Sequence, residues 1–215
     1  GTLYAAQVGA GFSINPAAGS AAPLAWIRLG AASSAEIEQL AGTLKPTDIM
    51  DVQARDPGDA SYTKITANGR TEWIKIRPGM DQAAAFLETH RYAAYRGASM
   101  GFSKMEGTTV NARDKVAYSA LQNCEKSMVA GDAANVPGNG IAIPKALKAG
   151  VVMALNLRGG QKDSAGNAIH SDWMPVDTRA LLAGEDIAAD ALDNTAHTEK
   201  IANPDNLKFS EKMRT

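Results

Sequence analysis

Short runs of apolar and polar residues at strand-like spacing, bounded by Gly, Pro, Ser or Asn, recur along most of the chain. "TLYAAQV" at 2–8 and "LAWIRLG" at 24–30 supply the apolar and β-branched residues that strands favour, and a Gly/Pro/Ser/Ala-rich connection joins them in a predicted hairpin. "GTTVNARDKVAYSAL" at 107–121 predicts strand, polar turn and strand. "GNGIAIP" at 138–144 and "GVVMALNL" at 150–157 predict another pair. The chain is therefore expected to be mainly β.

Helical insertions are predicted at three places in this strand pattern. Near 34–44, Ser33 can cap a helix whose apolar residues recur at helical spacing. The clearest helix is expected at 81–96, where apolar and polar residues alternate with the same period and Gly97 supplies a stop. Residues 177–192, "DTRALLAGEDIAADAL", predict a short helix followed by an acidic connection.

The order of these elements favours part of a β-propeller. No exact repeat is present, but strand pairs opened by Pro, Gly or Asn turns, including one at 68–69, have the rhythm expected of propeller blades. A sandwich or a barrel remains possible. The chain opens on a strand already under way and closes with "NLKFSEKMRT", which predicts a strand, a turn and the start of another strand. Residues 1–215 are therefore expected to be a single fragment of a larger β-propeller domain.

Composition removes several classes of function. Hydrophobic content of 45% and charged content of 21% are ordinary for a globular protein with a sizeable core. The net charge of -1 lacks the basic surplus that attracts nucleic acid, so we expect no nucleic-acid partner. No apolar run approaches the roughly 20 residues that cross a bilayer, and none is preceded by basic residues as in a secretory leader. A membrane span is therefore not expected.

Common catalytic signatures are absent from the sequence. It contains no P-loop, Gly-x-Gly-x-x-Gly, Gly-x-Ser-x-Gly or His-Glu-x-x-His pattern. His90, His170 and His197 lack metal-ligand spacing and are interpreted as surface or capping residues. The single cysteine, Cys124, excludes an internal disulfide and is expected to be a buried or half-buried thiol without a partner.

Glu106 is the first candidate site residue. It lies between Met105 and Gly107 at the entry to a predicted strand, where a carboxylate can point out of the end of a sheet. Calcium binds carboxylate oxygens and iron accepts them, so Glu106 is a possible metal ligand; a solvated turn acid is the alternative. Lys104 would lie on the same side of an extended backbone and could bind phosphate, or it could form a simple surface ion pair.

The segment "NPDNL" at 203–207 is the second candidate. Pro204 restricts the turn, and Asp205 with Asn206 presents several oxygens at the start of a strand. Ordinary turn formation explains these residues equally well. Both candidates place an acid or amide at a turn that leads into a strand, and a propeller brings the inner strands of its blades to one axis.

With these residues in hand, the chain resembles the PhoX-type alkaline phosphatases, a secreted family formerly known as a domain of unknown function. "GTLYAAQV" and "AWIRL" resemble that family's G-x-L-Y-x-A and W-x-x-L strands. The most specific part runs from 86 to 118 and is similar to the family's F-L-E-x-R-R-Y-A-A helix, K-x-E-G turn and V-x-Y-x-A strand. "NGIAIPKALKAGVVMALNL" and "IANPDNLKF" resemble two later segments. His90, Ala149 and Met153 depart from the family pattern.

The resemblance implies a β-propeller that holds calcium and iron and hydrolyses phosphate monoesters in the periplasm or outside the cell. By position, it makes Glu106 a metal ligand, places Lys104 near the phosphate and gives Asp205 and Asn206 as calcium-side oxygens. Arg91 matches the second arginine of R-R-Y-A-A and would contact phosphate or brace the turn. Completing the metal cage would require residues outside this chain. A calcium-dependent lactonase or phosphotriesterase and a non-catalytic propeller scaffold are the alternatives.

Overall fold

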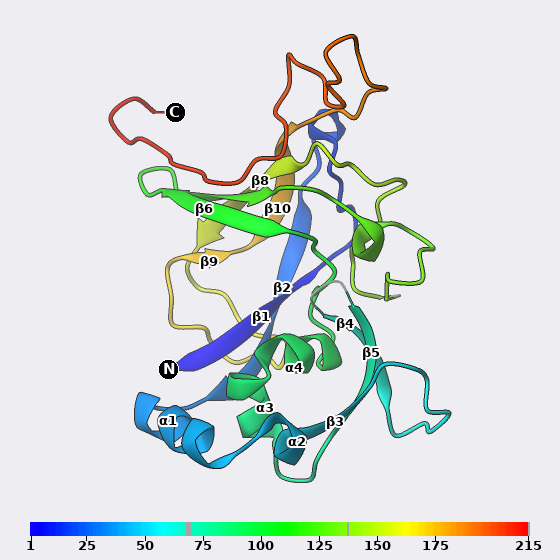
Figure 1. Cartoon of the computed structure of the whole chain (residues 1–215). Helices are drawn as coiled ribbons and strands as arrows, with labels where there is room; N and C mark the ends of the chain where they lie inside the picture. Colours follow the sequence, from blue (N-terminus) through cyan, green and yellow to red (C-terminus); the bar gives the residue numbers. More distant parts are fainter. Residues whose placement is uncertain (68–69, 137, 215) are drawn as a thin grey trace.

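The structure, a computed structural model, describes residues 1–67, 70–136 and 138–214. The turn predicted at 68–69 lies outside these residues. More of the chain lies in strands than in helices, and the helices interrupt the strand order (Figure 1). The prediction of a mainly β chain with helical insertions is therefore confirmed. Within the described ranges, no helix is long and apolar enough to span a membrane.

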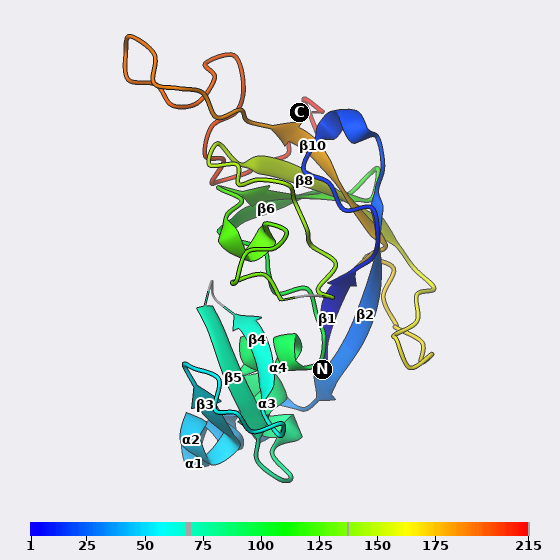
Figure 2. The same cartoon turned by 90° about the vertical axis from the view of Figure 1, so that its right-hand side faces the viewer.

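A curled antiparallel sheet forms a half-barrel and contains most of the strands (Figure 2). Its order is β1-β2-β10-β8-β7-β6, with β9 paired to β8. The predicted hairpin is present, because Thr2 pairs with Ala31 and Val8 with Leu24. The strands are β1 (Thr2–Val8), β2 (Ala22–Ala31), β6 (Met105–Asn111), β7 (Val116–Leu121), β8 (Val151–Arg158), β9 (Met174–Pro175) and β10 (Asp177–Ala183). No complete ring of propeller blades is present in the described part of the chain.

A smaller sheet and the helices lie beyond one end of the half-barrel (Figures 1 and 2). The small sheet has the antiparallel order β3-β5-β4. A capping box in which Ser33 and Glu36 bind each other's backbone N–H begins the first helix, as the serine predicted. These elements are α1 (Ser34–Thr43), α2 (Pro46–Ile49), β3 (Met50–Gln53), β4 (Thr63–Ala67), β5 (Arg70–Ile76), α3 (Asp81–Leu87) and α4 (Thr89–Tyr95), with short 3₁₀ turns at Pro16–Ala18 and Lys126–Met128.

Most of the segment 81–96 is helical, but the prediction of one continuous helix is wrong, because the chain forms two helices, α3 and α4. Glu88 separates them with φ -126° and ψ 41°, outside helical geometry. The break lets the two helices pack on different elements, α3 on β2 and α4 on β4. The alanines of α3 and Tyr92 of α4 are thereby all buried. Burial on two separate surfaces therefore overrides the continuous helical pattern.

The helix predicted at 177–192 is also wrong. Its first part is β10, in which Arg179 pairs with Ala154 and Ala180 with Met153 of β8. Thr178 and Ala180 are buried two positions apart, which is strand spacing. The remainder is irregular, and the Asp190 carboxylate accepts backbone N–H groups of the turn that follows it. Pairing with β8 therefore decides the conformation that the local pattern left open.

Two hydrophobic clusters form the core. One lies among β2, the small sheet and helices α3 and α4, and includes Ile74 and Tyr92 at 0% and 1% exposure. The other lies on the curled sheet and the loop that follows β7, and includes Val151 and Met128, which are fully buried. The half-barrel and the helical part therefore bury separate sets of side chains, and the candidate site lies at the end of the half-barrel.

Candidate functional site

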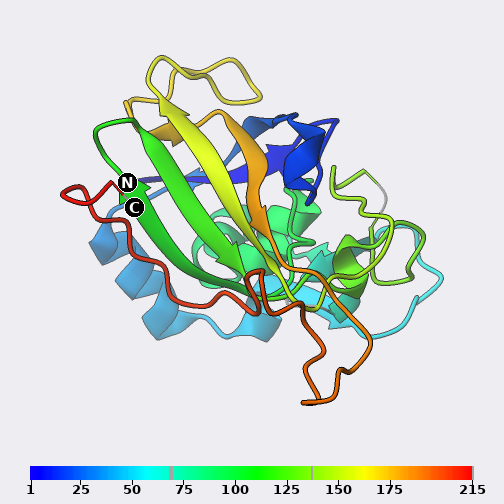
Figure 3. The same cartoon turned by 90° about the horizontal axis from the view of Figure 1, so that it is seen from above.

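The two candidate segments lie side by side although they are far apart in sequence. The C-terminal segment runs along β6, which is the last strand of the curled sheet (Figure 3). The Gly107 N–H donates to the Asp205 carbonyl at 2.8 Å. Farther along, the Phe209 N–H donates to the Thr109 hydroxyl at 3.0 Å. The K-x-E-G turn and the P-D-N segment therefore form one surface.

Gly107 permits this close approach. A Cβ atom at this position would lie 2.6 Å from the Asp205 carbonyl oxygen and 2.6 Å from the Leu207 nitrogen, both of which are backbone atoms. Any larger residue would therefore push the C-terminal segment away from β6. The glycine of the K-x-E-G turn thus has a structural role that its sequence position did not reveal.

Lys104 and Glu106 form an ion pair in which Nζ lies 2.8 Å from Oε1. The backbone at Lys104 is left-handed, with φ 47°. The extended backbone expected there is therefore not present. An irregularity in the pairing of β6 with β7 follows Lys104, between Met105 and Thr108. The hydrogen bond and charge of Glu106 raise the pKa of Lys104, and the charge of Asp205 adds to this effect. Lys104 is therefore a charged group that is paired with Glu106 and feels the charge of Asp205.

Asp205 and Asn206 are exposed at the turn beside this pair. The Asp205 carboxylate accepts a hydrogen bond of 3.4 Å from the Gln122 side chain. Asn203 fixes the turn, because its backbone N–H donates to Ala149 at 2.9 Å and its side chain donates to the Lys148 carbonyl at 2.9 Å. Gln122 was not predicted as a site residue, since an isolated amide carries no distinctive sequence signal, and Asn203 was included only as part of the candidate segment 203–207.

Arg91 lies elsewhere and connects α4 to β5. Its Nε and Nη2 atoms lie 2.7 and 3.1 Å from the two carboxylate oxygens of Glu72, and its Nη1 lies 2.8 Å from Glu88. These hydrogen bonds, with Glu72 first, raise the pKa of Arg91. Its guanidinium therefore braces the fold, and Arg91 is not among the described residues that line the pocket beside Lys104.

A pocket of about 590 Å³ lies beside Lys104. Its charged and ionisable side chains are Lys104, Lys126, Glu125 and His90. Ser103 shapes the wall, because its hydroxyl accepts the Glu125 N–H at 2.8 Å and donates to the Asn123 carbonyl at 3.1 Å. We call this volume the polar pocket. Its two lysines give it the means to bind an anion.

Glu106 and Asp205 are carboxylates on two adjacent segments of the chain. No group of three or more His, Cys, Asp or Glu residues suited to a metal occurs in the described ranges. Calcium takes about six to eight oxygen ligands. Two carboxylates are too few for such a shell, so the described residues do not by themselves form a calcium site.

Cys124 takes no part in this site. It is fully buried, and burial raises the pKa of its thiol to about 12, with a smaller effect from Asp186. A thiol of that kind is protonated at neutral pH and unreactive. The prediction of a buried cysteine is confirmed.

The chain matches no protein-family model, no curated protein and no solved structure.

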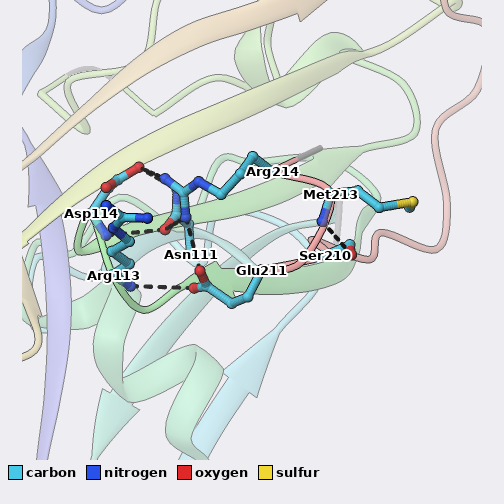
Figure 4. A network of polar contacts seen from close by, with 7 residues as sticks. All are labelled: Asn111, Arg113, Asp114, Ser210, Glu211, Met213 and Arg214. Carbon is cyan, nitrogen blue, oxygen red and sulfur yellow. Dashed lines mark hydrogen bonds and ion pairs between the residues drawn. The ribbon is translucent and has the colours of Figure 1, made fainter.

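The end of the C-terminal segment is held to the β6–β7 turn by a polar network (Figure 4). Arg214 pairs with Asp114 and donates to the Asn111 side chain at 3.3 Å. Asp114 also accepts from Asn111 at 2.9 Å, while Glu211 accepts the Arg113 N–H at 3.2 Å. We call this network the C-terminal clasp. The C-terminal clasp fixes one end of the C-terminal segment, and Asp205 lies toward the other end.

The C-terminal clasp should open in acid. The hydrogen bond from Asn111 and the pairing with Arg214 lower the pKa of Asp114 below its usual 3.8. The stabilisation from Asp114 is therefore complete above pH 3.8 and is lost as the pH falls through the lower folded-state pKa. Hydrogen-exchange protection of the Met213 amide should fall over that interval. In Asp114→Asn the protection should not change there, and an unchanged wild-type protein would contradict the prediction.

Proposed function

We propose that this chain is part of a metal-dependent hydrolase of phosphate monoesters, similar to the PhoX-type alkaline phosphatases. Lys104 binds a phosphate oxygen, and Glu106 and Asp205 bind hard cations, calcium and iron. The observation that carries the proposal is the hydrogen bond from Gly107 to Asp205, because it joins two segments that the resemblance selects independently. Such an enzyme would act in the periplasm or outside the cell.

The charges of the site suit a phosphate ester. A phosphoryl group presents several anionic oxygens, and the Lys104 ammonium has N–H donors beyond the one directed at Glu106. The Lys104 side chain is 54% exposed, so a ligand can reach it. Bound cations would polarise the phosphoryl group and balance its charge. Glu106, Asp205 and the amide of Asn206 are the oxygens that this chain offers to them.

The propeller is part of the same proposal. The curled sheet would belong to a larger β-propeller, with the Lys104 end of β6 facing the central site and further metal ligands contributed from outside the residues described. Turn acids at the ends of strands are consistent with such a site.

Hydrolysis of p-nitrophenyl phosphate by the full-length protein, with calcium and iron present, tests the proposal. We expect turnover that falls about 100-fold or more in Glu106→Gln and about 10-fold or more in Lys104→Met. Glu38→Gln and Lys162→Met change the same charges away from the site and should keep wild-type rates, and melting temperatures should show that all four variants fold.

Two other results would point to the alternatives. Turnover of lactones or phosphotriesters, together with bound calcium and no iron, would indicate a different hydrolase. An absence of turnover on every ester, with the Lys104–Glu106 pair serving only to hold the turn, would indicate a non-catalytic scaffold.

A further inference from the structure

A second cavity lies on the concave side of the half-barrel. Its volume is about 370 Å³, and β1, β2, β7, β8 and β10 all contribute to its wall. The wall includes the side chains of Trp26, Leu121, Met153 and Leu155. Alternate residues of a strand point to the same face of a sheet, which places such side chains on the cavity side. On β7, Ser119 and Leu121 line the cavity while the ring of Tyr118 stacks on Phe209 with centroids 5.7 Å apart. We call this volume the apolar chamber.

The apolar chamber separates the two hydrophobic clusters. Leu29 and Ala93 on its wall belong to the cluster around the helices, whereas Leu121 and Met153 belong to the cluster on the curled sheet. No charged side chain is among the described residues that line it. Hydroxyl groups such as that of Ser119 are its main polar features. Its interior therefore suits a hydrocarbon group.

The apolar chamber adjoins the polar pocket, and the two share part of their walls. Ser99, Met100, Phe102 and Met105 line both volumes. Met105 is 58% exposed, which is unusual for an apolar side chain at a boundary between two cavities. Methionine is flexible and adapts to the shape of a ligand. A single molecule that displaces the Met105 side chain would therefore reach from one volume into the other.

We propose that the apolar chamber and the polar pocket together bind one anionic amphiphile with a single alkyl chain. The alkyl chain enters the chamber beneath Trp26 and Met153, and the anionic head group contacts Lys104 and Lys126. The charges agree with this orientation, because the two lysines outnumber the one carboxylate, Glu125, that lines the polar pocket, whereas no charged side chain is among the described residues that line the chamber. Binding of this kind needs neither a metal nor hydrolysis, so the inference goes beyond the proposed function.

Calorimetric binding of alkyl phosphonates to the full chain in EDTA tests this inference. Phosphonates resist hydrolysis and EDTA removes metals, so a failure of the proposed phosphatase activity would leave this measurement unaffected. From hexyl- to decylphosphonate, measured below micelle formation, we expect affinity to rise about fourfold for each methylene that enters the apolar chamber. Methylphosphonate should bind too weakly to measure. An affinity that is independent of chain length would overturn the inference.

Variants separate the two halves of the site. Ala6→Phe fills part of the apolar chamber from β1 and should abolish the dependence on chain length. Lys126→Met should weaken every phosphonate about tenfold and keep that dependence, while the distant Lys162→Met should change neither. Decanoate should bind like decylphosphonate if the lysines recognise negative charge, and decyltrimethylammonium should not bind. Equal binding of the cationic detergent would overturn the proposed orientation, and the wild-type series stands by itself if Ala6→Phe fails to fold.

Discussion

Gly140→Ala should lose about 2–5 kcal/mol of the free energy of unfolding. Gly140 has φ 77°, a conformation that costs an alanine about 1–2 kcal/mol. A Cβ atom there would also overlap the Val8 carbonyl oxygen, which belongs to the backbone of β1, and such overpacking costs about a further 1–3 kcal/mol. Val8 is only 3% exposed, so the strand has little room to move. Urea denaturation should show a lower midpoint with an unchanged slope.

Gly138→Ala is the matched control. Gly138 has φ 87°, but a Cβ atom there would meet nothing within 4 Å. The variant should therefore lose only the conformational contribution, about 1–2 kcal/mol. Equal losses in the two variants would show that the loop does not press against β1 as described.

Gly107→Ala should release the segment that carries Asp205. The added methyl group would lie 2.6 Å from two backbone atoms of that segment, so the Gly107–Asp205 hydrogen bond must lengthen or break. We expect a loss of about 1–3 kcal/mol. Hydrogen-exchange protection of the Phe209 amide, which donates to Thr109 of β6, reports the detachment, and the proposed hydrolytic activity should fall with it.

Gly42→Ala provides the comparison for this variant. Gly42 lies near the end of α1 with open space around it, so the change should stabilise the protein by about 0.5–1 kcal/mol. If Gly107→Ala left exchange at Phe209 unchanged, the C-terminal segment would not depend on the glycine.

Local pattern was sufficient for the elements whose partners are near in sequence. The hairpin of β1 and β2 and the α1 helix follow from apolar spacing, a turn-rich connection and the capping serine. The predicted strand at 138–144 is instead a loop that touches Val129 through one isolated bridge at Ile143. Gly140 in this loop fits close against β1, a relation between distant segments that local spacing does not contain.

Relations between distant segments also limited what the sequence could predict of the candidate site. The sequence singled out Lys104, Glu106 and Asp205, and the structure brings them together. The sequence did not indicate that Glu72 would pair with the guanidinium of Arg91, since Glu72 lies on strand β5 and Arg91 on helix α4. The polar pocket and the apolar chamber depend on the curl of the sheet, which strand propensity does not specify.

The C-terminal segment beside β6 also has a consequence for solubility. The outermost strand of an open sheet presents unpaired backbone groups that can pair with a second molecule. Asp205 occupies the Gly107 amide on that side, and Ser99 covers the opposite edge, since its N–H donates to the Ala6 carbonyl at 2.9 Å and its hydroxyl accepts the Val8 N–H at 2.8 Å. Irregular segments thus cover both edge strands of the curled sheet, β1 and β6. Removing residues 203–214 would leave β6 open to intermolecular strand pairing and aggregation.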